Sequence, residues 1–466
     1  MTSTTVSPPR PLPGWLKNTL FAAGILTLCW GGAIVYWRAS PNTPATDDLL
    51  LVLLAAPLCL LAAIWLGKKV VFARPKAAPS AAAVAPAQAA ASATPSAPPL
   101  AILATSLRAP HGASAEELAA AIAANQARPD LDPELVDDDD FPVTSARSEE
   151  AVDEALQEEI TEWLMLAGMA ELQLGETHWR ALTLGTAVVR DLAGEALMQL
   201  LPEAGTPPPL RLLPLLPAGW TVEQRHAAGL WFKHTVAQFG WPVEHLTRIE
   251  VARDATLASV LGQCAADSQA VTMLVACDSH IAQETVDQWA AANVLSTAAR
   301  AQGRIPGEGA AGLLLTSLAA ARHDAGAAFA RLYPLAETRR EVASDSARRP
   351  DTNRFIDLAQ RSASAAGVTL TDVIAIAADT DHRISRGLEL MGLASASLPQ
   401  LDGGSDVLRT GASTGTCGAV TTLCALALAR NAALTANAPV LFVSNDDPFI
   451  CNMAVLSPPP ALAVPV

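Results

Sequence analysis

The stretch Val271–His280, VTMLVACDSH, is the clearest indication of the fold of this chain. Its first seven residues form an apolar run without the alternation expected of a strand that has one face in water. Such a run is typical of a strand covered on both faces. A second run of this kind, VIAIAA, occupies Val373–Ala378. Strands covered on both faces lie in sheets with helices on either side, so the two runs predict a layered α/β domain.

Helical segments alternate with the predicted strands. Capping boxes, in which Ser114 precedes Glu117 and Thr221 precedes Gln224, predict the starts of two helices. The segment Thr416–Leu434 is apolar on nearly all sides, which predicts a helix at the centre of the domain. Further helices are expected at Glu149–Leu174, Thr221–Phe239 and Thr352–Ala365. Further strands are expected at Leu100–Leu107, Leu210–Leu216, Gly312–Ser317, Ala328–Leu335, Val440–Ser444 and Phe449–Leu456.

Two uncharged apolar runs lie near the start of the chain, at Thr19–Trp37 and Leu49–Leu66. Each is about as long as a helix that crosses a bilayer, which takes ~20 residues. A signal peptide or a buried core helix explains one such run, whereas two closely spaced runs predict a membrane hairpin within residues 1–77. Basic residues flank the pair, at Arg10, Lys17, Lys68, Lys69, Arg74 and Lys76. Because basic residues stay on the cytoplasmic side, both ends are expected to face the cytoplasm, with the hairpin as an inner-membrane anchor.

Residues 78–98 consist almost entirely of Ala, Pro and Ser, which predicts a semi-extended linker. The remainder, 99–466, is expected to form a soluble domain in two halves, about 99–280 and 281–466. Residues 1–80 carry seven Lys or Arg and two Asp, a net charge of +5, so the −15 of the whole chain leaves −20 for the rest. Lys233 is the single lysine of that rest. A surface this acidic repels phosphate backbones, which argues against nucleic-acid binding.

The seven cysteines indicate neither a disulfide framework nor a metal centre, because no C-x-x-C pair and no His/Cys cluster occurs in the sequence. Two of them lie in the predicted membrane spans. The other five lie in apolar runs and are expected to be buried thiols in a reducing compartment. They are Cys264, Cys277, Cys417, Cys424 and Cys451. We therefore expect no metal and no cofactor.

Two short motifs resemble enzyme signatures. Residues 411–415, GASTG, fit the G-x-S-x-G turn that presents a nucleophilic serine, here Ser413. The α/β-hydrolases need a histidine after that serine, and the last histidine of the chain is His382, so this fold is excluded. Residues 307–312, GEGAAG, fit G-x-G-x-x-G, but an apolar strand follows them where a dinucleotide site has a helix. The glycines are therefore expected to allow close backbone approach.

Polar residues follow both of the continuous apolar strands. Asp278 and His280 follow the first strand, and Asp379, Asp381 and His382 follow the second. Sites in α/β proteins form beyond the carboxyl ends of such strands, so these are the best polar candidates. The alternative, that they are solvated or hydrogen-bonded loop residues, remains open at this point.

From Leu100 onward, four segments occur in an order that resembles the β-ketoacyl synthases. They are LAILATSLRAPHGASAEEL, VTMLVACDSHIAQETVDQW, RIPGEGAAGLLLTS and TGASTGTCGAVTTL. The third looks like the GEGAG segment of synthases, and the fourth looks like the glycine-rich turn that enters a second central helix. The resemblance implies the thiolase-like fold, with layers in the order α/β/α/β/α.

The chemistry of that family needs a cysteine at a helix N-terminus, where the dipole favours the thiolate, and two histidines. Carried over by the matching segments, the histidines would fall at Asp379 and Ala412, and the cysteine would fall near Arg253–Ala255. Cys264 comes two to three turns too late. The resemblance therefore implies an inactive relative with no catalytic residues. Its relict site would comprise Asp379, Asp381, His382, Ala412, Ser413 and Cys417.

The arrangement of membrane hairpin, linker and degenerate synthase-like domain resembles the bacterial type VI secretion lipase-adaptor family. That resemblance implies a non-catalytic adaptor that binds a lipase effector and helps load it onto the secretion spike protein. It leaves a homodimer open. The alternatives are an acyl-condensing or acyl-binding enzyme that uses Cys264, Cys277 or Cys417, a serine hydrolase that uses Ser413, and a structural protein of an envelope machine.

Overall fold

The computed structural model describes residues 97–201, 207–252, 255–267, 269–323, 328–346 and 351–459. The predicted membrane spans and residues 78–96 of the predicted linker lie outside the described residues. Residues Ala93–Val466 form one unit. Within the described part of that unit, one helix, Ala419–Ala436, has the length and apolar composition of a membrane span. It is also the central helix of the domain, and its apolar side chains are buried there.

The first half of the domain contains a sheet with strand order β5-β4-β6-β7-β1. Its strands are β1 (Leu100–Arg108), β4 (Leu210–Leu215), β5 (Leu246–Arg248), β6 (Val271–Ser279) and β7 (Glu308–Ser317). Numbered along the chain, the order is 3-2-4-5-1. The strands β4, β5 and β6 are parallel, and β7 is antiparallel to its neighbours β6 and β1.

The second half repeats this order, as β11-β10-β12-β13-β8. Its strands are β8 (Ala330–Leu332), β10 (Ala375–Ala378), β11 (Val407–Arg409), β12 (Val440–Ser444) and β13 (Ile450–Ser457). Again β13, the fifth strand, is antiparallel to both of its neighbours. A short strand β9 (Ala336–Arg339) extends the edge of β13. Because β1 pairs with β8, the two repeats form one continuous set of strands.

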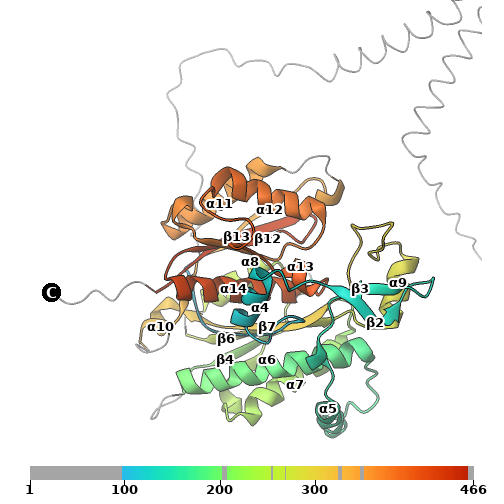
Figure 1. The fold of residues 1–466 in the computed structure, drawn as a ribbon. Helices are drawn as coiled ribbons and strands as arrows, with labels where there is room; N and C mark the ends of the chain where they lie inside the picture. Colours follow the sequence, from blue (N-terminus) through green and yellow to red (C-terminus); the bar gives the residue numbers. More distant parts are fainter. Residues whose placement is uncertain are drawn as a thin grey trace, which may run out of the picture. The chain divides into compact units, whose positions relative to one another are not determined.

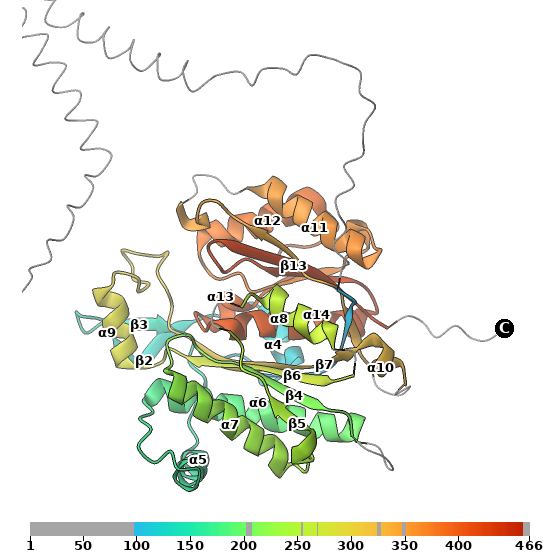
Figure 2. The same ribbon diagram turned by 180° about the vertical axis from the view of Figure 1, so that it is seen from behind.

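Helices cover both repeats and fill the space between them (Figures 1 and 2). The outer helices of the first half are α6 (Glu176–Leu200) and α7 (Val222–Gln238), and those of the second half are α11 (Thr352–Ala366) and α12 (Ile384–Ser397). Between the sheets lie α4 (Ala115–Ala123), α8 (Leu257–Ala266) and α14 (Ala419–Ala436). Helix α14 contacts strands of both halves. The layers are therefore α/β/α/β/α, as the resemblance to the β-ketoacyl synthases implied.

The central layer explains why α14 has no polar face. Val420, Leu423, Cys424, Leu426 and Leu428 are all fully buried, although they lie on different sides of the helix. Each large aliphatic side chain of this kind contributes about 1.5–3 kcal/mol when it is fully removed from water. The helix packs into the apolar cluster that also holds the inner side chains of both sheets.

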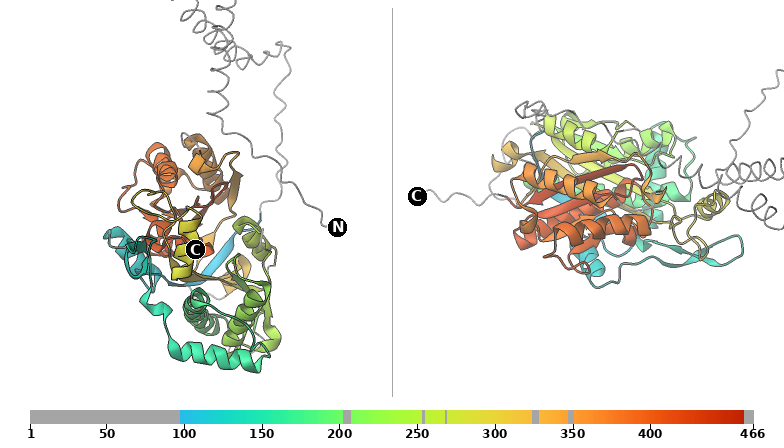
Figure 3. Two further views of the ribbon diagram at one scale, coloured as in Figure 1. Left: turned by 90° about the vertical axis from the view of Figure 1, so that its right-hand side faces the viewer. Right: turned by 90° about the horizontal axis from the view of Figure 1, so that it is seen from above.

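Several boundaries differ from the predictions. The helix expected at Glu149–Leu174 is a short 3-10 turn followed by α5 (Glu154–Leu166), and α6 was not predicted. The strand expected at Ala328–Leu335 is limited to β8. Residues 130–145 form a separate hairpin of β2 (Asp130–Val136) and β3 (Pro142–Ser145). This hairpin contacts α9 (Gln283–Ala291), and the two lie together at one end of the layers (Figure 3).

Candidate functional site

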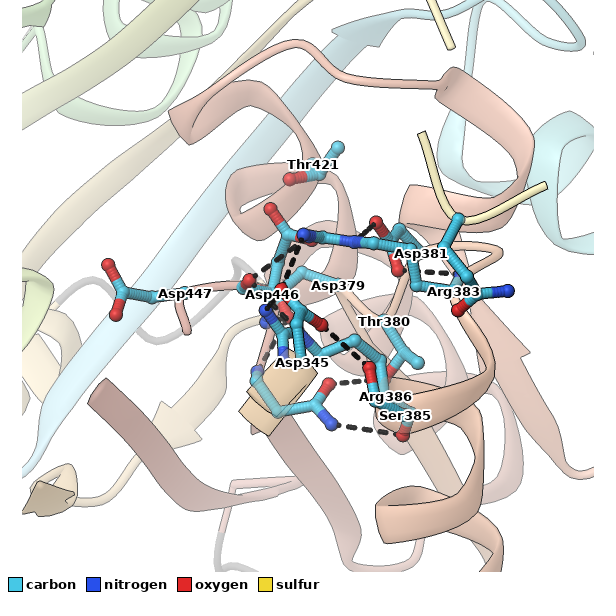
Figure 4. Close-up of polar contacts among 12 residues, drawn as sticks. Asp345, Asp379, Thr380, Asp381, Arg383, Ser385, Arg386, Thr421, Asp446 and Asp447 are labelled. Atoms are coloured by element: carbon cyan, nitrogen blue, oxygen red, sulfur yellow. Dashed lines mark hydrogen bonds and ion pairs between the residues drawn. The ribbon is translucent and has the colours of Figure 1, made fainter. Parts of the chain in front are cut away.

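Asp379, where the resemblance would place the first synthase histidine, lies at the carboxyl end of β10 and is buried (Figure 4). Its Oδ2 atom accepts hydrogen bonds from the hydroxyls of Ser444, at 2.6 Å, and Thr422, at 2.9 Å. Its Oδ1 atom accepts from the backbone N–H groups of Asn445, at 2.8 Å, and Asp446, at 3.1 Å. Burial raises the pKa of Asp379, and these hydrogen bonds act in the opposite direction. All four bonds stay within the protein, so this carboxylate holds the β12–β13 turn in place.

A network of charges surrounds that turn. The guanidinium of Arg383 contacts the carboxylate of Asp381 and lies 2.8 Å from Asp446 and 3.2 Å from Asp345. Arg386, which is fully buried, lies 3.1 Å from the same Asp345 oxygen. Burial, followed by the charges of neighbouring carboxylates, raises the pKa of Asp446 to about 7. The network joins the start of α12 to two loops, as Figure 4 shows.

His382 and Ala412 do not restore the missing imidazoles. His382 follows Asp381, but its buried Nε2 atom has no hydrogen-bond partner among the described residues. Ala412 lies in the short helix α13 (Thr410–Thr414) and carries no polar group. No ion pair or hydrogen bond between His382 and Asp379 occurs in the described part of the chain. The relict positions therefore contain no pair of groups placed for proton transfer.

Ser413 does not have the environment of a nucleophile. Its side chain is buried, and its hydroxyl donates to the backbone carbonyl of Arg409 at 3.1 Å. The first glycine of the motif has a packing role, because a Cβ atom on Gly411 would lie 2.2 Å from the carbonyl oxygen of Asp379. The last glycine, Gly415, has φ of 65°, which favours glycine. GASTG is thus a tightly packed turn between β11 and α14.

The described cysteines are all buried. Burial raises the pKa of the thiol at Cys264, Cys277, Cys417, Cys424 and Cys451. Thiol nucleophiles react as thiolates, which a raised pKa disfavours. Cys264 also lies near the end of α8, away from the helix N-terminus. None of these side chains has the environment that activates a synthase cysteine.

A cavity of about 1030 Å³ lies at the carboxyl ends of β4 and β6, beside the first residues of α14. Ala255 lines it, and this residue ends the stretch in which a synthase nucleophile would lie. Arg253, at the other end of that stretch, is outside the described residues. Asp278 and His280 also line the cavity, with Oδ2 of the first 3.6 Å from Nε2 of the second. The structure thus brings together the two candidates at the carboxyl end of β6, Asp278 within the strand and His280 just after it.

Asp278 lies at the wall of this cavity with only 9% of its side chain exposed. Burial raises the pKa of Asp278, while His280 and the backbone N–H of Ser279 lower it. Its Oδ2 atom lies next to Gly418, where an added Cβ would come within 2.9 Å. Gly418 is the N-cap of α14, so the carboxylate lies close to the positive end of that helix.

The candidates at the end of β6 and those after β10 do not form one site. Among the described residues, no hydrogen bond or ion pair links Asp278 or His280 to Asp379 or Asp381. Arg383 and Arg386, which complete the second network, were not identified from the sequence; the available signal was the occurrence of two arginines within four residues after DTDH. No group of three or more His, Cys, Asp or Glu side chains in the described ranges is arranged to hold a metal ion.

No family model and no curated protein matches the chain. Solved structures do match it. A ketosynthase from module 6 of the bacillaene synthase of Bacillus subtilis is 13% identical, covers 78% of this chain and 72% of its own, and has a TM-score of 0.53. A ketosynthase from module 1 of the bacillaene synthase of Bacillus amyloliquefaciens is 13% identical, with coverages of 79% and 74% and a TM-score of 0.52.

A third match is the oxazolomycin ketosynthase domain of Streptomyces albus, which is 13% identical, with coverages of 78% and 74% and a TM-score of 0.51. Together with the repeated strand order, these matches establish that the described domain has the thiolase-like fold of ketosynthases. At this level of identity they establish the fold alone. What the domain does must be argued from its own side chains.

Proposed function

We propose that this chain is a non-catalytic adaptor that binds a lipase effector of the type VI secretion system and assists its loading onto the spike. A predicted membrane hairpin would hold its ketosynthase-like domain on the cytoplasmic side of the inner membrane. The observation that carries the non-catalytic part of the proposal is the state of Asp379. Where the resemblance would place a catalytic histidine, this chain has a carboxylate that accepts four internal hydrogen bonds.

The other two catalytic positions support the same proposal. Ala412 has no proton to transfer, and Arg253–Ala255, the stretch in which the resemblance would place the nucleophile, contains no cysteine. Condensation needs a thiolate, and burial raises the pKa of every described cysteine. A scaffold that keeps its layers without these groups is suited to binding. The adaptor role itself rests on the resemblance in arrangement to the lipase-adaptor family.

Binding is tested with the full chain purified in detergent and the lipase-like effector encoded beside it. We expect the two to co-purify, and an unrelated effector of similar size serves as the control. Deleting the chain should abolish export of that effector and leave export of other effectors intact. Normal export of the effector in the deletion strain, together with no co-purification of the chain and the effector, would contradict the adaptor proposal.

The same export assay separates an adaptor from an enzyme. A variant in which Cys264, Cys277 and Cys417 are all changed to serine removes every proposed thiol nucleophile. We expect this variant to restore export in the deletion strain as well as the wild-type chain does. If export is restored by the wild-type chain but not by the serine variant, the enzyme hypothesis is favoured.

An acyl-binding or acyl-condensing enzyme is the second candidate, and the retained cavity of about 1030 Å³ favours it. Cys277 lines that cavity. A cysteine-directed synthase inhibitor distinguishes the two candidates. Stoichiometric modification of one cysteine, lost after its change to serine, would support the enzyme, whereas no modification is expected of the adaptor.

A further inference from the structure

Two carboxylates with similar burial are held very differently in this domain. Asp379 accepts four hydrogen bonds, which is about the full capacity of an ionised carboxylate. The side chain of Asp278 is 9% exposed, and in the described structure no other side chain donates a hydrogen bond to it. The nearest side-chain nitrogen recorded beside it, Nε2 of His280, lies 3.6 Å away, which is too far for a hydrogen bond. Asp278 therefore has free acceptor positions beside the cavity.

A buried carboxylate with unused acceptors is costly unless another group completes its environment. The N-terminus of α14, at Gly418, favours a negative charge there but supplies only part of what is missing. A ligand with a positive charge and N–H donors would supply the rest. No lysine or arginine side chain in the described ranges forms an ion pair with Asp278.

The side chains that line the cavity indicate that such a ligand also has an apolar part. Trp220 and Trp289 line it, together with Pro214, Leu216 and Val251. Sites with apolar walls and a few fixed polar groups bind ligands with an apolar body. The ring of Trp289 lies 4.9 Å from that of His280, and the guanidinium of Arg304 lies 5.7 Å from the centre of the Trp289 ring, so this tryptophan offers a ligand apolar contact.

The cavity is also lined by the positive side chains Arg225 and Arg248. Arg248 and Glu250 come from β5 and the residues after it, and they form an ion pair of 2.8 Å. Arg225 lies on α7 and has no ion pair among the described residues. Arg248 is level with Met273, because both pair with Leu212 of β4 between them, so its backbone is offset from Asp278 both across the sheet and along the strands. Glu284, on α9, adds a further negative charge to the cavity.

We propose that this cavity binds an organic cation, with a primary ammonium or guanidinium group against Asp278 and an apolar body against the tryptophans. The cation would belong to a free amine or to a basic side chain of a protein partner. The net charge of −20 outside residues 1–80 attracts either source. The inference does not depend on the adaptor role, since a cation site is equally possible in an enzyme.

The test compares three ligands with the same chain and different head groups: hexylammonium, 1-hexanol and hexanoate. Binding to the full chain in lipid nanodiscs is measured by calorimetry, and empty nanodiscs provide the background. We expect hexylammonium to bind at least tenfold more tightly than the other two. Equal or tighter binding of hexanoate would overturn the proposal, and this comparison needs no variant.

A variant then tests whether the ammonium group binds at Asp278. Asp278→Asn keeps the size of the side chain and removes its charge, so hexylammonium should lose at least tenfold in affinity. Glu244→Gln removes an exposed charge that does not line the cavity, and binding should be unchanged. A preference for hexylammonium that survives Asp278→Asn would contradict the assignment to this residue.

The two sources of the cation give different results in a pull-down with the partner. If a basic side chain of the partner occupies the cavity, Asp278→Asn weakens the complex and hexylammonium competes with it. If the cation is a free amine, neither Asp278→Asn nor added hexylammonium weakens the complex with the partner. The calorimetric measurement does not involve the effector. Failure of the adaptor proposal and failure of the cation-binding proposal can therefore be distinguished.

Discussion

The guanidinium of Arg180 forms a two-point ion pair with the carboxylate of Glu308, with Nε 2.8 Å from Oε2 and Nη2 2.6 Å from Oε1. Only 5% and 0% of the two side chains are exposed. Glu308 also accepts hydrogen bonds from the backbone N–H of Ser148, at 2.7 Å, and the hydroxyl of Ser279, at 2.9 Å. Because Ser279 follows Asp278, this pair supports one wall of the cavity from inside the domain.

Arg180→Ala should lower the free energy of unfolding by about 3–5 kcal/mol, because it leaves the buried charge of Glu308 without its partner. Urea unfolding followed by tryptophan fluorescence measures the loss. The matched control is Arg190→Ala, whose ion pair with Glu159 is more than one-third exposed on both sides. That change should cost about 1 kcal/mol or less. Equal effects of the two changes would contradict the role given to Arg180.

The pKa of Asp446, raised to about 7 by burial and by neighbouring carboxylates, predicts a pH dependence. The folded chain keeps this proton up to about pH 7, whereas the unfolded chain releases it near the ordinary value of 3.8. The folded state binds more protons in this window, so stability falls as pH rises from about 4 to about 7. Asp446→Asn should remove that part of the slope in urea unfolding.

The pH test depends on the slope, since Asp446→Asn also loses the contact with Arg383 and lowers stability at every pH. The control is Asp357→Asn, on an exposed position of α11, which should keep the slope of the wild-type chain. A slope that is the same with and without Asp446 would show that this carboxylate does not hold its proton in the folded state.

Native protein treated with iodoacetamide at pH 8 should leave the described cysteines unmodified. The physical reason is their burial, which limits access and raises the pKa of each thiol. Peptide mass spectrometry reads each position, and the denatured chain should be modified at all of them. The informative exception would be Cys277, because it lines the cavity and its rapid modification would point to an enzyme.

Gly411→Ala should destabilise the domain by about 1–3 kcal/mol or more, because the new Cβ would lie 2.2 Å from a backbone oxygen that cannot move independently. Gly194→Ala is the control, since nothing lies within 4 Å of its added Cβ. Gly194 lies inside α6, where alanine should stabilise the helix by roughly 0.5–1 kcal/mol. Thermal unfolding of both variants tests the difference in sign.

The fold was predictable where one local signal determined the structure. The capping box of Thr221 and Gln224 forms with both of its hydrogen bonds, at 2.9 and 3.2 Å. Helix α6 was missed because Gly185, Thr186 and Val188 are weak helix formers. Their positions reflect packing: a Cβ on Gly185 would come within 2.7 Å of the ring of Phe232, on α7. Contacts between segments far apart in sequence decided this helix.

For the candidate site, the sequence predicted where polar residues gather but not which groups they bind. The rule that polar residues gather beyond the carboxyl ends of strands identified Asp278 and His280, and they do share a cavity. The rule does not say whether a carboxylate there is free or satisfied. Asp379 has its acceptors filled by residues more than 40 positions away, and Arg383 reaches Asp345 across 38 positions. Such pairings exist only once the loops are folded.

The four hydrogen bonds of Asp379 also limit what can replace this residue. Asp379→His would leave two hydroxyls and two backbone N–H groups of β12, the β12–β13 turn and α14 without their acceptor. Each unsatisfied group costs about 1–3 kcal/mol, so an imidazole at this position would destabilise the fold before it could take part in any chemistry. A histidine could be accommodated here only together with changes in the segments that now donate to the carboxylate.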